Sequence, residues 1–177
     1  TVSSSQSFQT RALCTAKSNQ ALALVYWQQA YKLNPSDDTL RSIAFTHEAL
    51  GEIGAAIETL NQIEKSAWSK QDYLFAAQLS YQRRNYQDSE AYWELAKANN
   101  EAWLDFGTEL AIQQQQYLKA QTLSQQLLVL KDDLTDQQWA RQAIIYQRTD
   151  QPAKAARAWQ IASEKSPQNS AFKLSWA

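Results

Sequence analysis

Five small residues recur along this chain at a nearly constant interval, and that interval constrains the fold more than any other feature. They are Ala23, Ala56, Ser89, Ala120 and Ala155, with successive spacings of 33, 33, 31 and 35 residues. A period of this length is typical of repeat architectures, in which each unit stacks on its neighbours because it cannot bury its apolar face alone. The sequence therefore predicts an array of stacked repeats.

The stretch from Trp139 to Pro167 shows what one repeat contains. Small and aromatic residues alternate there, in the order Trp139, Ala143, Tyr146, Ala155, Trp159 and Ala162, with Gln142 beside the first small residue and Pro167 after the last. The small residues let two helices approach closely, the aromatic residues fill the space around that contact, and Pro167 helps to end the second helix. The pattern resembles the tetratricopeptide repeat (TPR), a helix–turn–helix unit of about 34 residues.

The resemblance implies an all-α fold, a TPR-like α-solenoid in which about five helix–turn–helix pairs form a right-handed superhelix, followed by a C-terminal helix. We expect a single domain over residues 1–177, with repeats at 4–36, 37–69, 70–99, 100–134 and 135–168, and a capping helix or truncated repeat at 169–177. Three Gly and three Pro agree with this, because β-rich folds need more turn residues.

Local signals predict several helix ends. Residues 1–4 have no pattern and are expected to fray, with a first helix over 5–17. Ser36 or Asp37 can cap a helix, and Gly51 can supply a left-handed C-terminal position. Ile63 is expected in the second helix of its repeat, and the run Gln113–Gln116 is expected to add one residue to the fourth turn.

Composition excludes several classes of partner. Seventeen basic and eighteen acidic residues give a net charge of −1, so we expect no nucleic-acid partner. The longest apolar run, Ala21–Trp27, is too short to cross a bilayer, so no direct membrane insertion of this segment is expected. Because the chain begins at Thr1 and contains no Met, we expect a processed chain or a fragment of a longer protein.

No set of residues predicts catalysis, a cofactor or a metal site. His47 and Cys14 are the only residues of their types, and both are expected to be packed between helices. The acidic pairs Asp37-Asp38 and Asp132-Asp133 lie in turns, where aspartate caps helices. Arg83-Arg84 is interpreted as a solvated corner. We expect no enzyme, no cofactor and no metal.

The first helices of the repeats are expected to line the concave side. At the positions that the TPR register exposes there, ten residues are predicted to bind a partner: Arg41, Phe45, Leu74, Phe75, Gln78, Tyr81, Leu104, Arg141, Ile144 and Arg148. Such a groove suits an extended or helical peptide with apolar anchors. The alternative is that Phe45, Phe75 and Tyr81 merely pack on neighbouring first helices.

Three stretches are similar to the NfrA-type outer-membrane phage-adsorption proteins: Cys14–Pro35, Asn99–Trp103 and Ile144–Pro152. In that family a periplasmic TPR region precedes a β-barrel and is linked to exopolysaccharide export, with a membrane glycosyltransferase as partner. The resemblance implies a location on the periplasmic side of a bacterial outer membrane. It also implies that a barrel would follow Ala177.

Three functions follow as hypotheses. The leading one is a non-catalytic protein-interaction scaffold of the bacterial envelope, linked to exopolysaccharide export or phage adsorption, which binds a protein partner or an exported glycan through the groove. Tyr and Trp side chains could stack on sugar rings. The alternative is a cytoplasmic TPR adaptor that binds a peptide segment of its partner. The third, an enzyme on a helical scaffold, is disfavoured because no catalytic motif is present.

Overall fold

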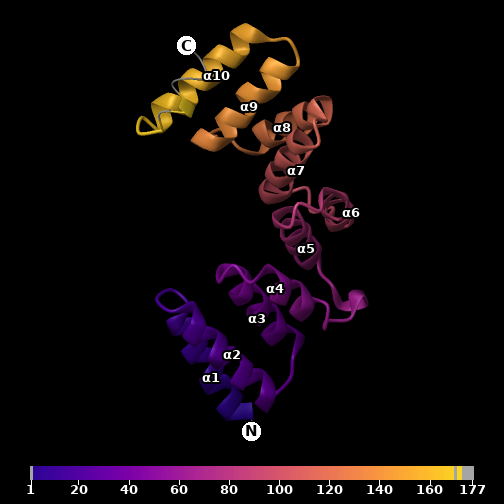
Figure 1. Ribbon diagram of the computed structural model, residues 1–177, viewed down its shortest axis with the longest axis vertical. Coiled ribbons are helices and arrows are strands. Elements are labelled where there is room, and N and C mark those ends of the chain that lie inside the picture. The colour runs from indigo at the N-terminus through magenta and orange to yellow at the C-terminus, as the bar shows by residue number, and fades with distance from the viewer. Residues whose placement is uncertain (1, 170, 173–177) are drawn as a thin grey trace. The chain divides into compact units, whose positions relative to one another are not determined.

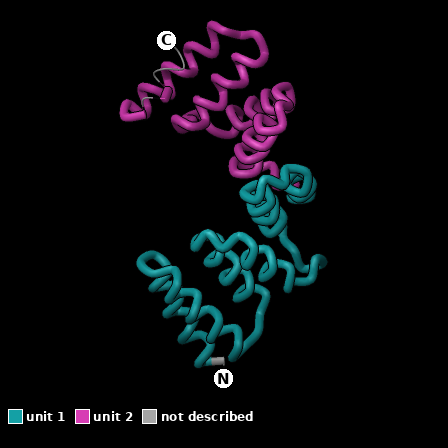
Figure 2. Tube along the Cα trace, viewed as in Figure 1, with its two compact units in different colours: residues 1–96 teal, residues 97–177 magenta. Residues whose placement is uncertain are grey.

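The computed structural model describes residues 2–169 and 171–172, and every regular element in that part of the chain is helical (Figure 1). The chain divides into two compact units, residues 1–96 and residues 97–177 (Figure 2). The five helix pairs that the repeat pattern predicts are all present. The single domain over 1–177 stays a prediction.

The first unit contains three helix pairs. The two helices of a pair lie side by side, and the second helix of one pair also contacts the first helix of the next. The pairs are α1 (Val2–Thr15) with α2 (Gln20–Leu33), α3 (Asp37–Ala49) with α4 (Ile53–Leu60), and α5 (Lys70–Gln82) with α6 (Tyr86–Ala96).

The second unit contains two helix pairs. They are α7 (Glu101–Gln113) with α8 (Tyr117–Leu130), and α9 (Asp136–Arg148) with α10 (Pro152–Lys165). Helix α9 contacts both α7 and α8, so the two pairs stack through their first helices as well as along the chain.

The five periodic small residues lie where the helices of each pair meet. Four of them are completely buried, and Ala155 is 2% exposed. Small residues of the first helices, such as Ala44 and Ala77, are completely buried as well. The hydroxyl of Ser89 donates a hydrogen bond of 2.8 Å to the carbonyl of Ala77, so this polar residue is satisfied inside the core.

The turn inside a repeat has one conformation in the last four pairs. A residue with positive φ follows the first helix: Gly51 (77°), Arg84 (60°), Gln115 (60°) and Asp150 (56°). The next backbone N–H then donates to a carbonyl five residues earlier, as from Gln116 to Ala111 at 2.8 Å. The fourth turn therefore has the same length as the others, and the extra residue expected at Gln113–Gln116 is not there. The long last spacing comes from the connection 131–135 instead.

The connection between α4 and α5 differs from the sequence-based expectation. Helix α4 ends at Leu60, before Ile63, and a short 3-10 helix, η1 (Lys65–Ala67), follows. Ile63 and Trp68 are nevertheless buried, and the indole N–H of Trp68 donates to the carbonyl of Ile63 at 3.1 Å. This irregular segment thus fills core space that a longer α4 would occupy.

Two predictions at the N-terminus are wrong. Helix α1 includes Val2–Ser4, which were expected to fray, and the hydroxyl of Ser5 bonds to the carbonyl of Ala30 at 3.0 Å in a buried contact with α2. Cys14 is exposed, because the buried small position belongs to Ala12 and two residues along a helix turn the side chain by about 200°. At the other end, most of the predicted cap at 169–177 lies outside the described residues.

Candidate functional site

In the first unit, the predicted apolar anchors differ in exposure. The ring of Phe45 on α3 is 41% exposed, whereas Leu74 and Phe75 on α5 are 8% and 5% exposed. The Phe45 and Phe75 rings contact each other, with centroids 4.3 Å apart. Phe75 belongs to the hydrophobic core of the unit. Phe45 is therefore the anchor that offers a large apolar surface to a partner.

Arg41 holds α3 and α5 together. Its Nε donates to both carboxylate oxygens of Asp72 at 3.0 and 3.1 Å, and its other nitrogens donate to Asp38 (2.9 Å) and to the carbonyl of Ala67 (3.0 Å). Asp72 is buried and also accepts the backbone N–H and hydroxyl of Ser69 in a capping box at the start of α5. The guanidinium is thus engaged within the unit.

The electrostatics of this pair favour its charged form. Burial by itself raises the pKa of Asp72, but the hydrogen bonds from Arg41 and Ser69 outweigh it, and the pKa lies below its usual value. The hydrogen bond to Asp72 raises the pKa of Arg41 in turn.

Gln78 and Tyr81 complete the predicted set in this unit. Both are half-buried, and the Tyr81 ring lies against Tyr86 of α6, with centroids 5.4 Å apart. One residue beyond Tyr81, the amide of Gln82 donates to Glu48 of α3 at 2.9 Å. Polar residues near the predicted set therefore also join α3 and α5 within the first unit.

A hollow of about 250 Å³ adjoins Phe45. Helices α2 and α3 and the turn after α1 contribute its lining: Ala16, Gln20, Trp27, Ser42, Phe45, Thr46 and Ala49. Trp27 is 7% exposed, so its indole forms part of the wall. Sequence reasoning assigned Trp27 only to packing, because it occupies a core position of a second helix. No feature of its spacing marks it as part of a surface.

In the second unit, Arg141 and Leu104 both make contacts inside the unit. Arg141 on α9 donates to Asp105 at 2.8 Å and to Glu109 at 2.6 Å, both on α7. Leu104 is 3% exposed, and Ile144 packs against the core of the α9–α10 pair. Arg141 thus repeats in this unit the role of Arg41, which is to join successive first helices.

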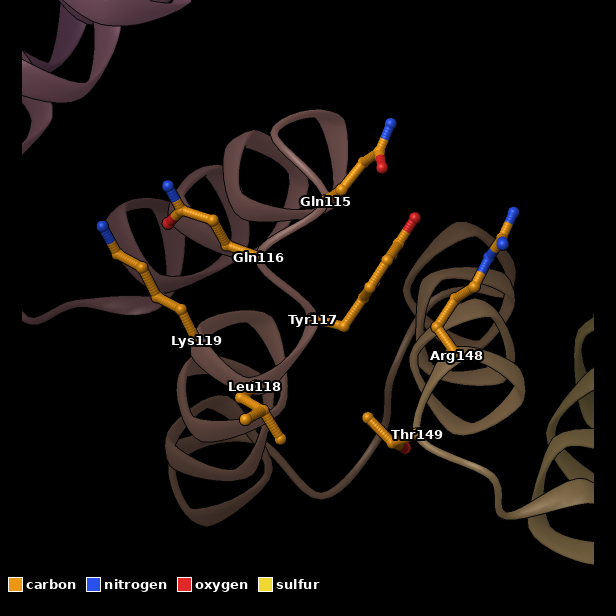
Figure 3. Close-up of a pocket in the computed structure, with 7 residues that line it drawn as sticks. All are labelled: Gln115, Gln116, Tyr117, Leu118, Lys119, Arg148 and Thr149. Atoms are coloured by element: carbon orange, nitrogen blue, oxygen red, sulfur yellow. The ribbon is translucent and has the colours of Figure 1, made fainter.

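Arg148 has a different environment. It lines a hollow of about 530 Å³ with the turn between α7 and α8 (Figure 3). The guanidinium carbon lies 5.6 Å from the centroid of the Tyr117 ring, a cation–π contact. Arg148 was predicted from the repeat register but Tyr117 was not, since the periodic pattern does not indicate which side chains adjacent repeats bring together.

Comparison with known proteins places the fold. No family model matches the chain, and no curated protein matches its sequence. A thermophilic TPR protein of Thermus thermophilus matches with a TM-score of 0.62 and 17% identity, over 97% of this chain and 96% of that one. The chain has the fold of the tetratricopeptide repeat proteins.

Two further TPR-like structures differ in extent. PilW, described as a widely conserved type IV pilus biogenesis factor, matches with a TM-score of 0.80 and 12% identity, over 96% of this chain and 81% of that one. The APC/C hetero-tetramer Cut9–Hcn1 matches with a TM-score of 0.75 and 17% identity, over 93% of this chain. The chain spans 33% of the length of the matched chain in that structure.

His47 and Cys14 carry the two most reactive types of side chain in this sequence, and both lie in ordinary structural surroundings. His47 is partly buried, and its Nδ1 lies 2.6 Å from a carboxylate oxygen of Glu52 in the following turn. Cys14 lies on the exposed side of α1. Among the described residues, no group of three His, Cys, Asp or Glu side chains could hold a metal ion. No helix in the same part of the chain combines the length and the apolar character needed to cross a membrane.

Proposed function

We propose that this chain is a non-catalytic protein-interaction scaffold, and that the hollow beside Phe45 receives an apolar side chain of its partner. The observation that carries the proposal is a phenylalanine left 41% exposed at the rim of a hollow walled by Trp27. Exposed aromatic side chains next to apolar hollows are typical anchors of protein interfaces. The TPR fold supports the proposal, because solenoids present extended surfaces of this kind.

We further propose that the scaffold works in a bacterial envelope and takes part in exopolysaccharide export or phage adsorption. The resemblance of three segments to NfrA-type proteins supports this setting. PilW supports the setting as well, since it is described as a pilus biogenesis factor and a pilus is a filament of the cell surface.

Site-specific photo-crosslinking tests the binding surface. A photoreactive phenylalanine analogue would replace Phe45 in one variant and Val25 in a control, in cells that express the full chain. Val25 is 48% exposed on α2 and does not line the hollow, so it matches Phe45 in exposure. We expect a crosslinked protein species from position 45 that position 25 does not give.

Affinity measurements complete the test. Once the crosslinked segment is known, a synthetic peptide of it should bind Phe45→Ala about tenfold more weakly than the unaltered chain, because truncation of an anchor costs about 1–2 kcal/mol. Val25→Ala should bind the peptide unchanged. Equal crosslinking at both positions, or equal peptide affinities of the two variants, would contradict the proposed surface.

Fractionation of bacteria that express the natural gene tests the envelope setting separately. We expect the protein in the periplasmic or outer-membrane fraction. Recovery with the cytosolic proteins would favour the adaptor hypothesis and overturn the envelope proposal, while leaving the surface at Phe45 unaffected.

A further inference from the structure

The turn between α7 and α8 and the end of α9 border an open hollow. Its volume of about 530 Å³ lies within the range of small-ligand sites. In Figure 3 the side chains of Gln115, Tyr117 and Arg148 extend toward the same side, from two different helix pairs of the second unit. None of the described residues that line the hollow is acidic.

Arg148 differs from the other arginines of its unit. Arg141 has two carboxylate partners, and Arg157 donates to Gln160 at 2.9 Å. Within the described part of the chain, the guanidinium of Arg148 has the ring of Tyr117 beside it and no carboxylate partner. Stacking on an aromatic ring leaves the donor edge of a guanidinium available, and that edge matches a carboxylate in a two-bond arrangement.

The other residues that line the hollow indicate which groups a ligand would carry beside a carboxylate. Leu118 is 76% exposed, which makes it one of the most exposed large apolar side chains among the described residues. The amide of Gln115 can donate and accept a hydrogen bond, as a peptide backbone requires, whereas the amide nitrogen of Gln116 already donates to Gln114 at 2.9 Å. A peptide with an apolar side chain next to an acidic one would contact Leu118 and pair with Arg148 at the same time.

We propose that this hollow binds an acidic segment of a partner protein, with a Glu or Asp carboxylate on Arg148 and an adjacent apolar side chain against Tyr117 and Leu118. The site is separate from the hollow at Phe45, since it lies in the other unit. It rests on the proposed function only in that its occupant is a protein segment. Charge complementarity and the exposed leucine favour a peptide over an acidic sugar.

Nuclear magnetic resonance titration of the full, ¹⁵N-labelled chain tests this site. The probes are N-acetyl-Glu-Leu-amide, its N-acetyl-Gln-Leu-amide counterpart and sodium glucuronate. The Glu probe should shift the backbone signals of Tyr117 and Leu118 and the side-chain Nε–H signal of Arg148. It should bind about tenfold more tightly than the Gln probe, the effect expected of one charge-assisted contact.

Two matched variants assign the effect. Arg148→Gln should abolish the preference for the Glu probe, whereas Arg157→Gln, an equal change of charge at an exposed position of α10, should retain it. Equal binding of the two dipeptides, or a preference that survives in Arg148→Gln, would overturn the proposal. Glucuronate that produces the same shifts where the Glu probe produces none would overturn it too, since the ligand would then be a sugar. None of these results affects the crosslinking test at Phe45.

Discussion

The pair Arg41–Asp72 makes a quantitative prediction, because one partner is almost completely buried. The carboxylate of Asp72 has a side-chain exposure of 3%, and Arg41 has 23%. Replacing Asp72 by Asn preserves the shape of the side chain but leaves a half-buried guanidinium without its buried negative partner. We therefore expect the substitution to destabilise the first unit.

The expected cost follows from the burial of the two groups. Removing one partner of a fully buried ion pair costs about 3–5 kcal/mol. Arg41 is partly exposed and keeps the carboxylate of Asp38 and the carbonyl of Ala67 as acceptors. We therefore expect Asp72→Asn to lower the free energy of unfolding by about 2 kcal/mol.

Asp38→Asn is the matched control. Asp38 bonds to the same guanidinium at 2.9 Å, but its side chain is 94% exposed. The expected loss is below about 0.5 kcal/mol. Urea unfolding followed by circular dichroism would measure both variants, and hydrogen exchange of the α5 amides would show that the first unit is the part affected. Equal losses in the two variants would refute the argument that burial gives this pair its strength.

The same pair predicts a pH dependence. The pKa of Asp72 is lower in the folded chain than in the unfolded one, so its ionised form stabilises the fold above the unfolded pKa of about 3.9. This contribution should be complete at pH 7 and should be lost as the pH falls below about 4 toward the folded pKa. The stability difference between the unaltered chain and Asp72→Asn should therefore shrink over that window. A difference that stays constant from about pH 7 to about pH 3 would contradict it.

Two further predictions concern the turns and the first helix. Gly51 (φ 77°) and Arg84 (φ 60°) occupy the same left-handed position of their turns. Gly51→Ala should therefore lower the free energy of unfolding by about 1 kcal/mol, and Arg84→Gly should raise it by up to about that amount. Urea unfolding would measure both changes. A change of the same sign in both would show that backbone strain is not the cause. Since Cys14 is exposed, it should react with a thiol reagent in native buffer at nearly the rate of a free thiol. Reaction only after denaturant is added would place it in the core, as the repeat pattern predicts.

The repeat frame could be predicted from the sequence because it depends on local rules. Each repeat carries a small residue, 31 to 35 positions from that of the next repeat, with an aromatic residue or leucine near it. Repeats contact chiefly their neighbours, so a pattern found once applies to the whole array. The burial of Ala23, Ala56 and Ser89 follows from that alone.

The candidate sites could be predicted only in part. The TPR register predicted Phe45 and Arg148, and both border hollows. It predicted Phe75 equally, but Phe75 is buried. It also predicted Arg41 and Arg141, which form ion pairs within their own units. Register specifies the direction in which a side chain leaves its helix. It does not specify whether another side chain already occupies that space.

What the tertiary structure decided is the identity of those neighbours. Arg41 meets Asp72 from 31 residues away, Arg141 meets Asp105 from 36 residues away, and Arg148 meets a tyrosine from the preceding repeat in place of a carboxylate. The sequence by itself determined that the chain folds as stacked helix pairs, because small residues at one period mark the close contacts of a repeat. Only the packed helices determined which of three similar arginines has an aromatic ring beside it and no carboxylate, because pairing depends on groups that adjacent repeats bring together.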